Sequence, residues 1–217
     1  MTCCCGSTTA ATARQFDAKR ARAELAAYHR RGPGPTTRRL LGGLGSVGGT
    51  AGSLLDVGSG VGVLTFELLK RGVVRAYCVD LSADSLAAGR EEATRQGRAG
   101  SIRWQQADFV AAAPELEPAD LVTLDRVVCC YPDYRPLLEN ATRLARRFLA
   151  LSYPRDRWFV HVALWVENTL RRLRDNPFRA FVHSPMELEV LLRQRGFTRT
   201  HRESSPAWHA DIYVRST

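Results

Sequence analysis

Residues 54 to 62 read Leu54-Leu55-Asp56-Val57-Gly58-Ser59-Gly60-Val61-Gly62, and this stretch decides the fold. Its apolar start predicts a short buried strand. The glycines that follow predict a tight turn, because glycine adopts positive φ without a steric cost. Residues 63–71 then carry leucines at helical spacing. A strand that runs through a glycine turn into a helix is typical of doubly wound α/β domains, where a ligand lies against the main chain of the turn.

Strands and helices alternate outward from this stretch. We expect strands over 53–57, 75–79, 102–105, 120–124 and 148–152, and helices over 13–31, 36–44, 63–71, 83–96 and 134–147. Strands separated by helices pair in parallel through right-handed crossovers. Two further helices, 157–174 and 185–195, precede strands at 197–203 and 207–214, which predict an antiparallel hairpin. The fold class is therefore α/β, a doubly wound, mostly parallel sheet of seven strands that ends in this hairpin.

The domain organisation follows from the same pattern. We expect residues 1–44 to hold a disordered tail and helices that form a lid, and residues 45–217 to form the α/β domain. A helical cap is expected at about residues 155–184. The long glycine-rich stretch 42–52 is interpreted as a loop rather than as a linker between domains.

Composition favours a single globular domain over a membrane-spanning, nucleic-acid-binding or metal-binding protein. The chain has 217 residues, 45% hydrophobic and 24% charged, which suits one globular domain. The longest apolar stretch, 158–166, is about half of the roughly 18 residues of a membrane span, so we expect a cytoplasmic protein without a span. The net charge of +9 comes almost entirely from scattered arginines, and we expect no nucleic-acid partner. Cys3-Cys4-Cys5 has no second cysteine pair at metal-binding spacing, and no metal site is expected.

Two carboxylates indicate which ligand the turn binds. Asp80 ends the second predicted strand, where a carboxylate accepts the ribose hydroxyls of an adenosine. Asp56 precedes the first glycine by two residues, and its charge would repel the pyrophosphate of a dinucleotide. The glycine spacing, GxGxG, also differs from the GxGxxG of dinucleotide sites. S-adenosyl-L-methionine carries an ammonium and a sulfonium, so electrostatics favours it over a nicotinamide cofactor.

Because it contains Asp56, the GxGxG turn and Asp80, the stretch from 53 to 152 resembles the class I S-adenosylmethionine-dependent methyltransferases. The resemblance implies a set of cofactor-binding residues, which lie at or just after the ends of the first four strands: Asp56, Gly58, Ser59, Gly60, Asp80, Leu81, Asp108, Phe109 and Asp125. In this resemblance Asp56 and the glycines cradle the methionine part, Asp80 binds the ribose, and Asp108 lies near the adenine amine.

The C-terminal half resembles one group within this family, the magnesium-protoporphyrin O-methyltransferases. The similar segments are 125–132, 179–183 and 196–197, and the chain departs from the group at Cys129-Cys130. The resemblance makes tetrapyrrole methylation one candidate among several.

Methyl transfer needs mainly alignment of donor and acceptor, and a base only when the acceptor arrives protonated. We expect a small acceptor, flat or anionic, methylated on a carboxylate or hydroxyl oxygen. Arg126 would hold a carboxylate, and Tyr131, His161 or His183 would be the base for a hydroxyl. The helix 157–174 is expected to cover the acceptor pocket. Its aromatic residues would line that pocket or belong to the core: Trp158, Phe159 and Trp165. The alternatives are an RNA or protein methyltransferase, a non-catalytic S-adenosylmethionine-binding protein, and a nicotinamide-dependent oxidoreductase.

Overall fold

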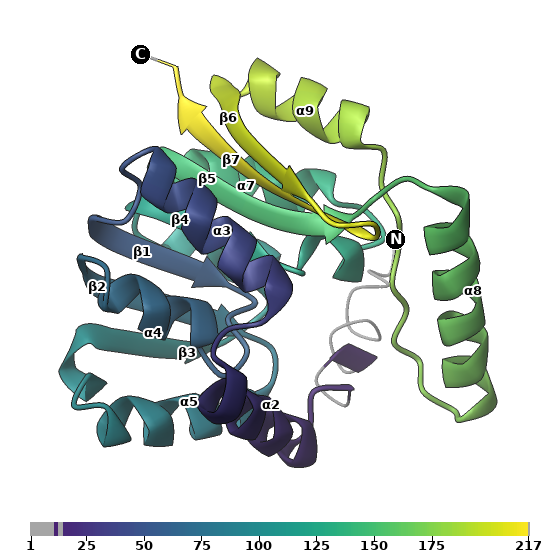
Figure 1. Ribbon diagram of the computed structural model, residues 1–217, viewed down its shortest axis with the longest axis horizontal. Coiled ribbons are helices and arrows are strands. Elements are labelled where there is room, and N and C mark those ends of the chain that lie inside the picture. Colours follow the sequence, from purple (N-terminus) through teal and green to yellow (C-terminus); the bar gives the residue numbers. More distant parts are fainter. Residues whose placement is uncertain (1–10, 13–14, 217) are drawn as a thin grey trace.

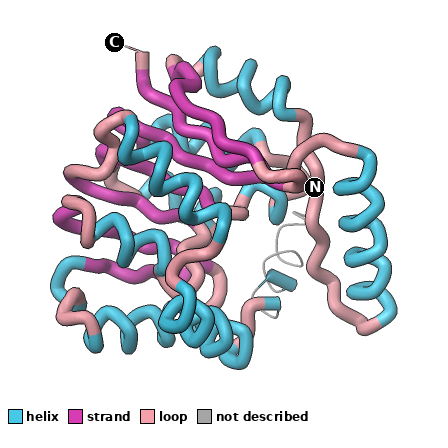
Figure 2. Tube along the Cα trace, viewed as in Figure 1, coloured by secondary structure: helices cyan, strands magenta, loops and turns pink. Residues whose placement is uncertain are grey.

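The structure, a computed structural model, describes residues 11–12 and 15–216, so the predicted tail with Cys3-Cys4-Cys5 lies outside the described residues. Seven strands form one sheet with helices on both faces (Figures 1 and 2), which confirms the predicted fold class. The strands are β1 Gly52–Val57, β2 Val73–Asp80, β3 Ile102–Gln106, β4 Ala119–Asp125, β5 Ala145–Pro154, β6 Phe197–Ser204 and β7 Trp208–Arg215. The longer helices are α2 Ala18–Arg31, α3 Pro35–Ser46, α4 Val63–Leu69, α5 Ala83–Arg95, α7 Arg135–Leu144, α8 Trp158–Leu173 and α9 Pro185–Gln194. The single turn α6 Phe109–Ala112 follows β3.

The strand order is β3-β2-β1-β4-β5-β7-β6. Strands β1 to β5 pair in parallel, and β7 runs antiparallel between β5 and β6. The chain leaves β1 in one direction to build β2 and β3, and returns to the other side of β1 with β4. Ligands of such sheets bind where the strand order reverses, at the carboxyl ends of the strands. Here that position lies between the loops that follow β1 and β4.

Alternate residues of the central strands enter two hydrophobic clusters, one on each face of the sheet. On β1, Leu54 packs with α3 and α4, while Leu55 and Val57 pack with α7 and α9. Strands buried on both faces are nearly continuous in apolar residues, as β4 and β5 are. Asp56 points to the same face as Leu54 and is the polar exception in this run.

Local signals explain most of the helix boundaries. The Ser82 side chain accepts a hydrogen bond from the backbone of Ser85 and begins α5, as predicted. Two predicted helix boundaries are wrong by three residues or more. Helix α2 begins at Ala18 rather than at residue 13, because Asp17 caps it. The helix predicted over 134–147 ends at Leu144, because Ala145 already pairs with Ala119 of β4.

Helix α8 stands apart from the sheet and is joined to the body by two extended segments (Figure 1). Of its residues, only Val160 is buried. Trp158 and Trp165 are 77% and 69% exposed, so the expectation that they line the pocket or belong to the core is wrong. Within the described part of the chain, no helix is long and apolar enough to cross a membrane.

Candidate functional site

A cavity of about 290 Å³ lies at the carboxyl ends of β1, β2 and β4. The glycine turn after β1 forms its floor, and the segment 126–131 after β4 forms one wall. Its opposite side is built by residues far away in the sequence, from the N-terminal segment, from α2 and α8, and from the chain that follows α8. The reversal of strand order thus places a hollow where the sequence predicted a ligand.

The glycine turn is shaped by two positive backbone angles, +62° at Gly58 and +55° at Gly60. A Cβ on Gly58 would lie 2.5 Å from a methyl carbon of Val127, so the loops after β1 and β4 touch there. A Cβ on Gly60 would meet only a carboxylate oxygen of Glu24, at 3.8 Å, and would project into the cavity. One glycine therefore permits packing, and the other leaves room for a ligand.

Asp56 lines this cavity although only 2% of it is exposed. The Thr123 hydroxyl donates to its Oδ1 at 2.6 Å, and the Thr65 hydroxyl donates to its Oδ2 at 2.7 Å. Burial raises the pKa of Asp56 to about 6, against the two hydroxyl hydrogen bonds, which lower it. Asp56 is therefore mostly ionised at neutral pH, and it places a negative charge beside the glycine turn.

Asp80 and Asp125, at the ends of β2 and β4, also line the cavity. Asp80 accepts backbone hydrogen bonds from Gly60 and Ser82, each at 2.8 Å, and burial raises its pKa. It thereby ties the glycine turn to the start of α5. Asp125 accepts from the hydroxyls of Thr37 and Ser152 at 2.5 and 2.6 Å. Leu81 and Phe109 line the cavity as well.

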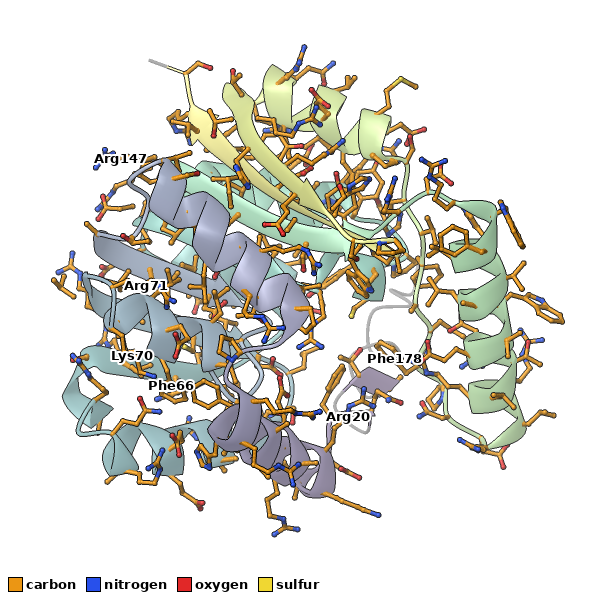
Figure 3. All side chains as sticks on the ribbon, viewed as in Figure 1. Arg20, Phe66, Lys70, Arg71, Arg147 and Phe178 are labelled. Carbon is orange, nitrogen blue, oxygen red and sulfur yellow. The ribbon has the colours of Figure 1, made fainter. Side chains whose placement is uncertain are left out.

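The side of the cavity opposite the glycine turn, its far wall, contains two aromatic rings, each with an arginine over it. The rings of Phe16 and Phe178 meet edge to face at 5.8 Å. Arg20 lies over the ring of Phe16 at 5.2 Å, and Arg171 lies over that of Phe178 at 5.0 Å. All four line the cavity, and Figure 3 shows Arg20 and Phe178 between α2 and α8. The Ser82 hydroxyl donates to the backbone oxygen of Phe16, which holds the N-terminal segment across the cavity.

Arg126 and Tyr131, two predicted catalytic residues, line the cavity from the segment after β4. Arg126 has a φ of +62°, a strained angle for a residue with a side chain, and its N–H donates to the Ser152 hydroxyl. Burial, with the charge of Asp108 beside it, raises the pKa of Tyr131 well above its ordinary value. The phenol therefore keeps its proton and can donate a hydrogen bond, but it is a poor base.

The structure does not bring the other predicted residues into the cavity. His161 is exposed on α8 and lies 2.7 Å from a carboxylate oxygen of Asp156. A ring nitrogen of His183 is 2.9 Å from the backbone oxygen of Tyr131, and burial lowers the pKa of His183. Asp108 caps α6, accepting from the backbone of Val110. None of these three side chains is among the residues that line the cavity.

Sequence reasoning missed several residues of the site. The sequence did not predict Phe16, Arg20, Arg171 or Phe178 as site residues. Cys130 was not predicted either, and it is half-buried and lines the cavity. One hydrogen-bond partner of Asp56 was predictable, because the register of β1 and β4 places Thr123 beside Asp56. Arg20 and Arg171 were not predictable as site residues, because they come together only through the fold.

The residues of the cavity fit the adenosyl ligand that the sequence predicted. The Ser59 hydroxyl, at the glycine turn, is buried and has no hydrogen-bond partner among the described residues. A ligand group can satisfy it, since a buried polar atom without a partner is costly. The ionised Asp56 suits a cationic group nearby, and Asp80 lines the same cavity. A pyrophosphate would meet two carboxylates instead.

Comparisons with known proteins agree with this geometry. Residues 54–147 match a family model described as a methyltransferase domain. The chain is 41% identical over 66 residues to a ribosomal protein L11 methyltransferase of Geobacter metallireducens. That match covers 30% of this chain and 22% of the relative.

Solved structures are similar over most of the chain. A magnesium protoporphyrin IX methyltransferase of Synechocystis with bound S-adenosylhomocysteine aligns with a TM-score of 0.67 and 23% identity. This alignment covers 83% of this chain and 82% of that one. A putative sarcosine dimethylglycine methyltransferase of Galdieria sulphuraria aligns with a TM-score of 0.67 and 15% identity, over 83% and 85% of the two chains. At these identities the likeness shows the shared fold.

Proposed function

We propose that the chain transfers the methyl group of S-adenosylmethionine to a carboxylate oxygen of a small, anionic acceptor. The match of residues 54–147 to a methyltransferase domain supports the methyl transfer. The observation that carries this proposal is the acceptor side of the cavity, where Arg20 and Arg171 each lie over an aromatic ring and Arg126 lines the same cavity. Guanidinium groups bind carboxylates through paired hydrogen bonds, and Phe16 and Phe178 offer contact to a flat body.

The charges of the three arginines differ in how far they are already neutralised. Arg171 pairs with Glu167, and Arg126 lies 3.5 Å from Glu24. Arg20 forms no ion pair within the described residues, and its guanidinium contacts the ring of Phe16. Arg20 is therefore the cation most available to an incoming carboxylate.

The chemistry of the cavity favours a carboxylate acceptor over a hydroxyl. A hydroxyl must lose its proton, whereas a carboxylate oxygen attacks without a base. The carboxylates that line the cavity are already engaged. Asp56 and Asp125 accept from hydroxyls, and Asp80 accepts from backbone N–H groups. Glu167 pairs with Arg171, and Glu24 lies 3.5 Å from Arg126. Tyr131 keeps its proton, and the two predicted histidines lie outside the cavity.

The donor, when bound, supplies a methyl group already activated on a sulfonium. The chain then has to hold the two reactants in line and keep water out. The turn 58–60 and Asp80 would hold the donor. The contact between Phe16 and Phe178 closes the cavity from the other side. In this proposal the N-terminal segment acts as the lid expected from the sequence, and α8 with the chain after it acts as the cap.

The chemical stability of the product tests the proposal. Purified protein is incubated with S-adenosylmethionine labelled in the methyl group and with a pool of small carboxylic acids, and the products are treated with mild alkali. A methyl ester releases its label as volatile methanol, whereas a methyl ether or a methylamine keeps it. We expect labelled product whose label is lost in alkali. Alkali-stable label would contradict carboxylate methylation while leaving the methyltransferase assignment intact.

A further inference from the structure

Helix α8 has one face turned towards the cavity, and that face is largely polar. Leu164, Glu167 and Arg171 line the cavity, and Val160, one turn before Leu164, is buried. Asn168, on the same side, accepts from the backbone of Ala180 at 3.0 Å and donates to the oxygen of the same residue at 2.8 Å. This face attaches the helix to the rest of the molecule.

The opposite face is apolar and exposed. It carries Trp158, Val162, Trp165, Val166, Leu170 and Leu173, between 43% and 77% exposed. Their spacing of three, four and seven or eight residues places them on one side of the helix, half a turn away from Leu164. A helix at a protein surface normally turns its apolar side inward. Here the arrangement is reversed, and Figure 3 shows side chains on the side of α8 that faces away from the body.

The ends of this apolar face are positively charged. The segment 155–179 holds six arginines against three carboxylates. Arg157 precedes the helix, and Arg172 and Arg174 stand at its end. All three are exposed, and none forms an ion pair within the described part of the chain. The carboxylates are partly occupied, since Asp156 pairs with His161 and Glu167 pairs with Arg171.

We propose that the outward face of α8 docks on the surface of an anionic phospholipid bilayer. An apolar helix face with tryptophans and flanking arginines fits the boundary between acyl chains and negative headgroups. The helix is too short to cross the bilayer, so it would lie in the plane of the surface. This proposal stands on the geometry and charge of α8 and does not depend on the acceptor.

A second copy of the chain fits this face less well. In a symmetric pair the two helices run either parallel or antiparallel. Because Arg157 precedes the helix and Arg172 and Arg174 stand at its end, both arrangements bring arginines of the two copies together.

Flotation with lipid vesicles tests the proposal on the full chain. Vesicles of phosphatidylcholine alone are compared with vesicles that contain an equal amount of phosphatidylglycerol. We expect binding to the mixed vesicles, weaker binding to the neutral ones, and loss of binding as salt is raised. Val162→Asp should reduce the affinity for mixed vesicles at least about tenfold, because it places a charge within the docked face. Trp165→Ser is a second variant, and circular dichroism checks that both fold.

Val190→Asp is the matched control. Val190 lies on α9 and is 48% exposed, against 51% for Val162, and its substitution should leave vesicle binding unchanged. Three results would overturn the proposal. The wild-type protein fails to bind anionic vesicles, or the Val162 and Val190 variants lose binding equally. The third is a dimer in sedimentation equilibrium that Val162→Asp dissociates. The last result would assign the face to a second copy.

Discussion

The hydroxyl of Thr123 on β4 donates a hydrogen bond of 2.6 Å to the carboxylate of Asp56 on the neighbouring strand β1. With Thr65 on α4, it holds a buried negative charge at the start of the glycine turn. The two hydroxyls offset only part of the cost of burial, since the pKa of Asp56 stays raised, at about 6. A charge kept in place at the expense of stability is typical of a functional position.

Asp56→Asn should therefore make the protein at least as stable at neutral pH. The pKa of this carboxyl is 3.8 in an ordinary environment and about 6 in the fold. Its ionisation thus lowers the free energy of unfolding as pH rises from about 4 to about 6, by up to about 3 kcal/mol. Asparagine cannot ionise and keeps the shape. Denaturant unfolding of both proteins should show the variant gaining on the wild type between pH 4.5 and 7.5, and a gain in the opposite direction would refute this account of Asp56.

The two glycines of the turn should respond differently to alanine. Gly58→Ala creates a clash with Val127 in addition to a strained φ, and should cost about 2–4 kcal/mol of stability. Gly60→Ala meets no close atom and should cost about 1–2 kcal/mol, while it fills the cavity and weakens donor binding.

Unfolding in urea and calorimetry with S-adenosylhomocysteine separate the two effects. Val127→Ala should recover part of the stability lost in Gly58→Ala and none of that lost in Gly60→Ala. Equal losses of stability in the two glycine variants would contradict the assigned roles.

Asp80→Ala should weaken the binding of S-adenosylhomocysteine by about 1–3 kcal/mol, because a charge-assisted hydrogen bond is lost. The variant also frees the backbone N–H groups of Gly60 and Ser82, so the turn loses its link to α5. Isothermal calorimetry measures the affinity. Asp84→Asn, at an exposed position near the start of α5, is the control and should bind like the wild type. If Asp80→Ala also bound with unchanged affinity, Asp80 would not belong to the site.

Arg20→Gln should raise the KM for the acceptor at least about tenfold and leave kcat within about twofold. The reason is that hydrogen bonds to a charged group contribute about 1.5–3 kcal/mol, and Arg20 would hold the acceptor rather than the reacting atoms. Arg22→Gln changes an exposed arginine of the same helix that does not line the cavity, and should have no effect on either constant. Steady-state kinetics with the acceptor found by the alkali test measures both. A fall in kcat at constant KM would argue against this role for Arg20.

Sequence reasoning predicted the part of the site that is local in the chain. Asp56, the glycines and Asp80 follow directly from strand ends, and strand ends are visible in the pattern of apolar residues. The far wall was not predictable, because Phe16 and Phe178 meet only after the whole sheet has formed. The helix 157–174 was predicted, but the spacing of its apolar residues does not reveal whether its apolar face points inward or outward. The sequence therefore could not show that Trp158 and Trp165 face outward.

The central claim is that the hollow between the loops after β1 and β4 holds a positively charged adenosyl ligand beside Asp56. Calorimetric titration of the full chain with S-adenosylmethionine, S-adenosylhomocysteine and NAD tests it most directly. The account predicts one-to-one binding of the first two compounds and no binding of NAD. Tight binding of NAD, with no response to the other two, would contradict it.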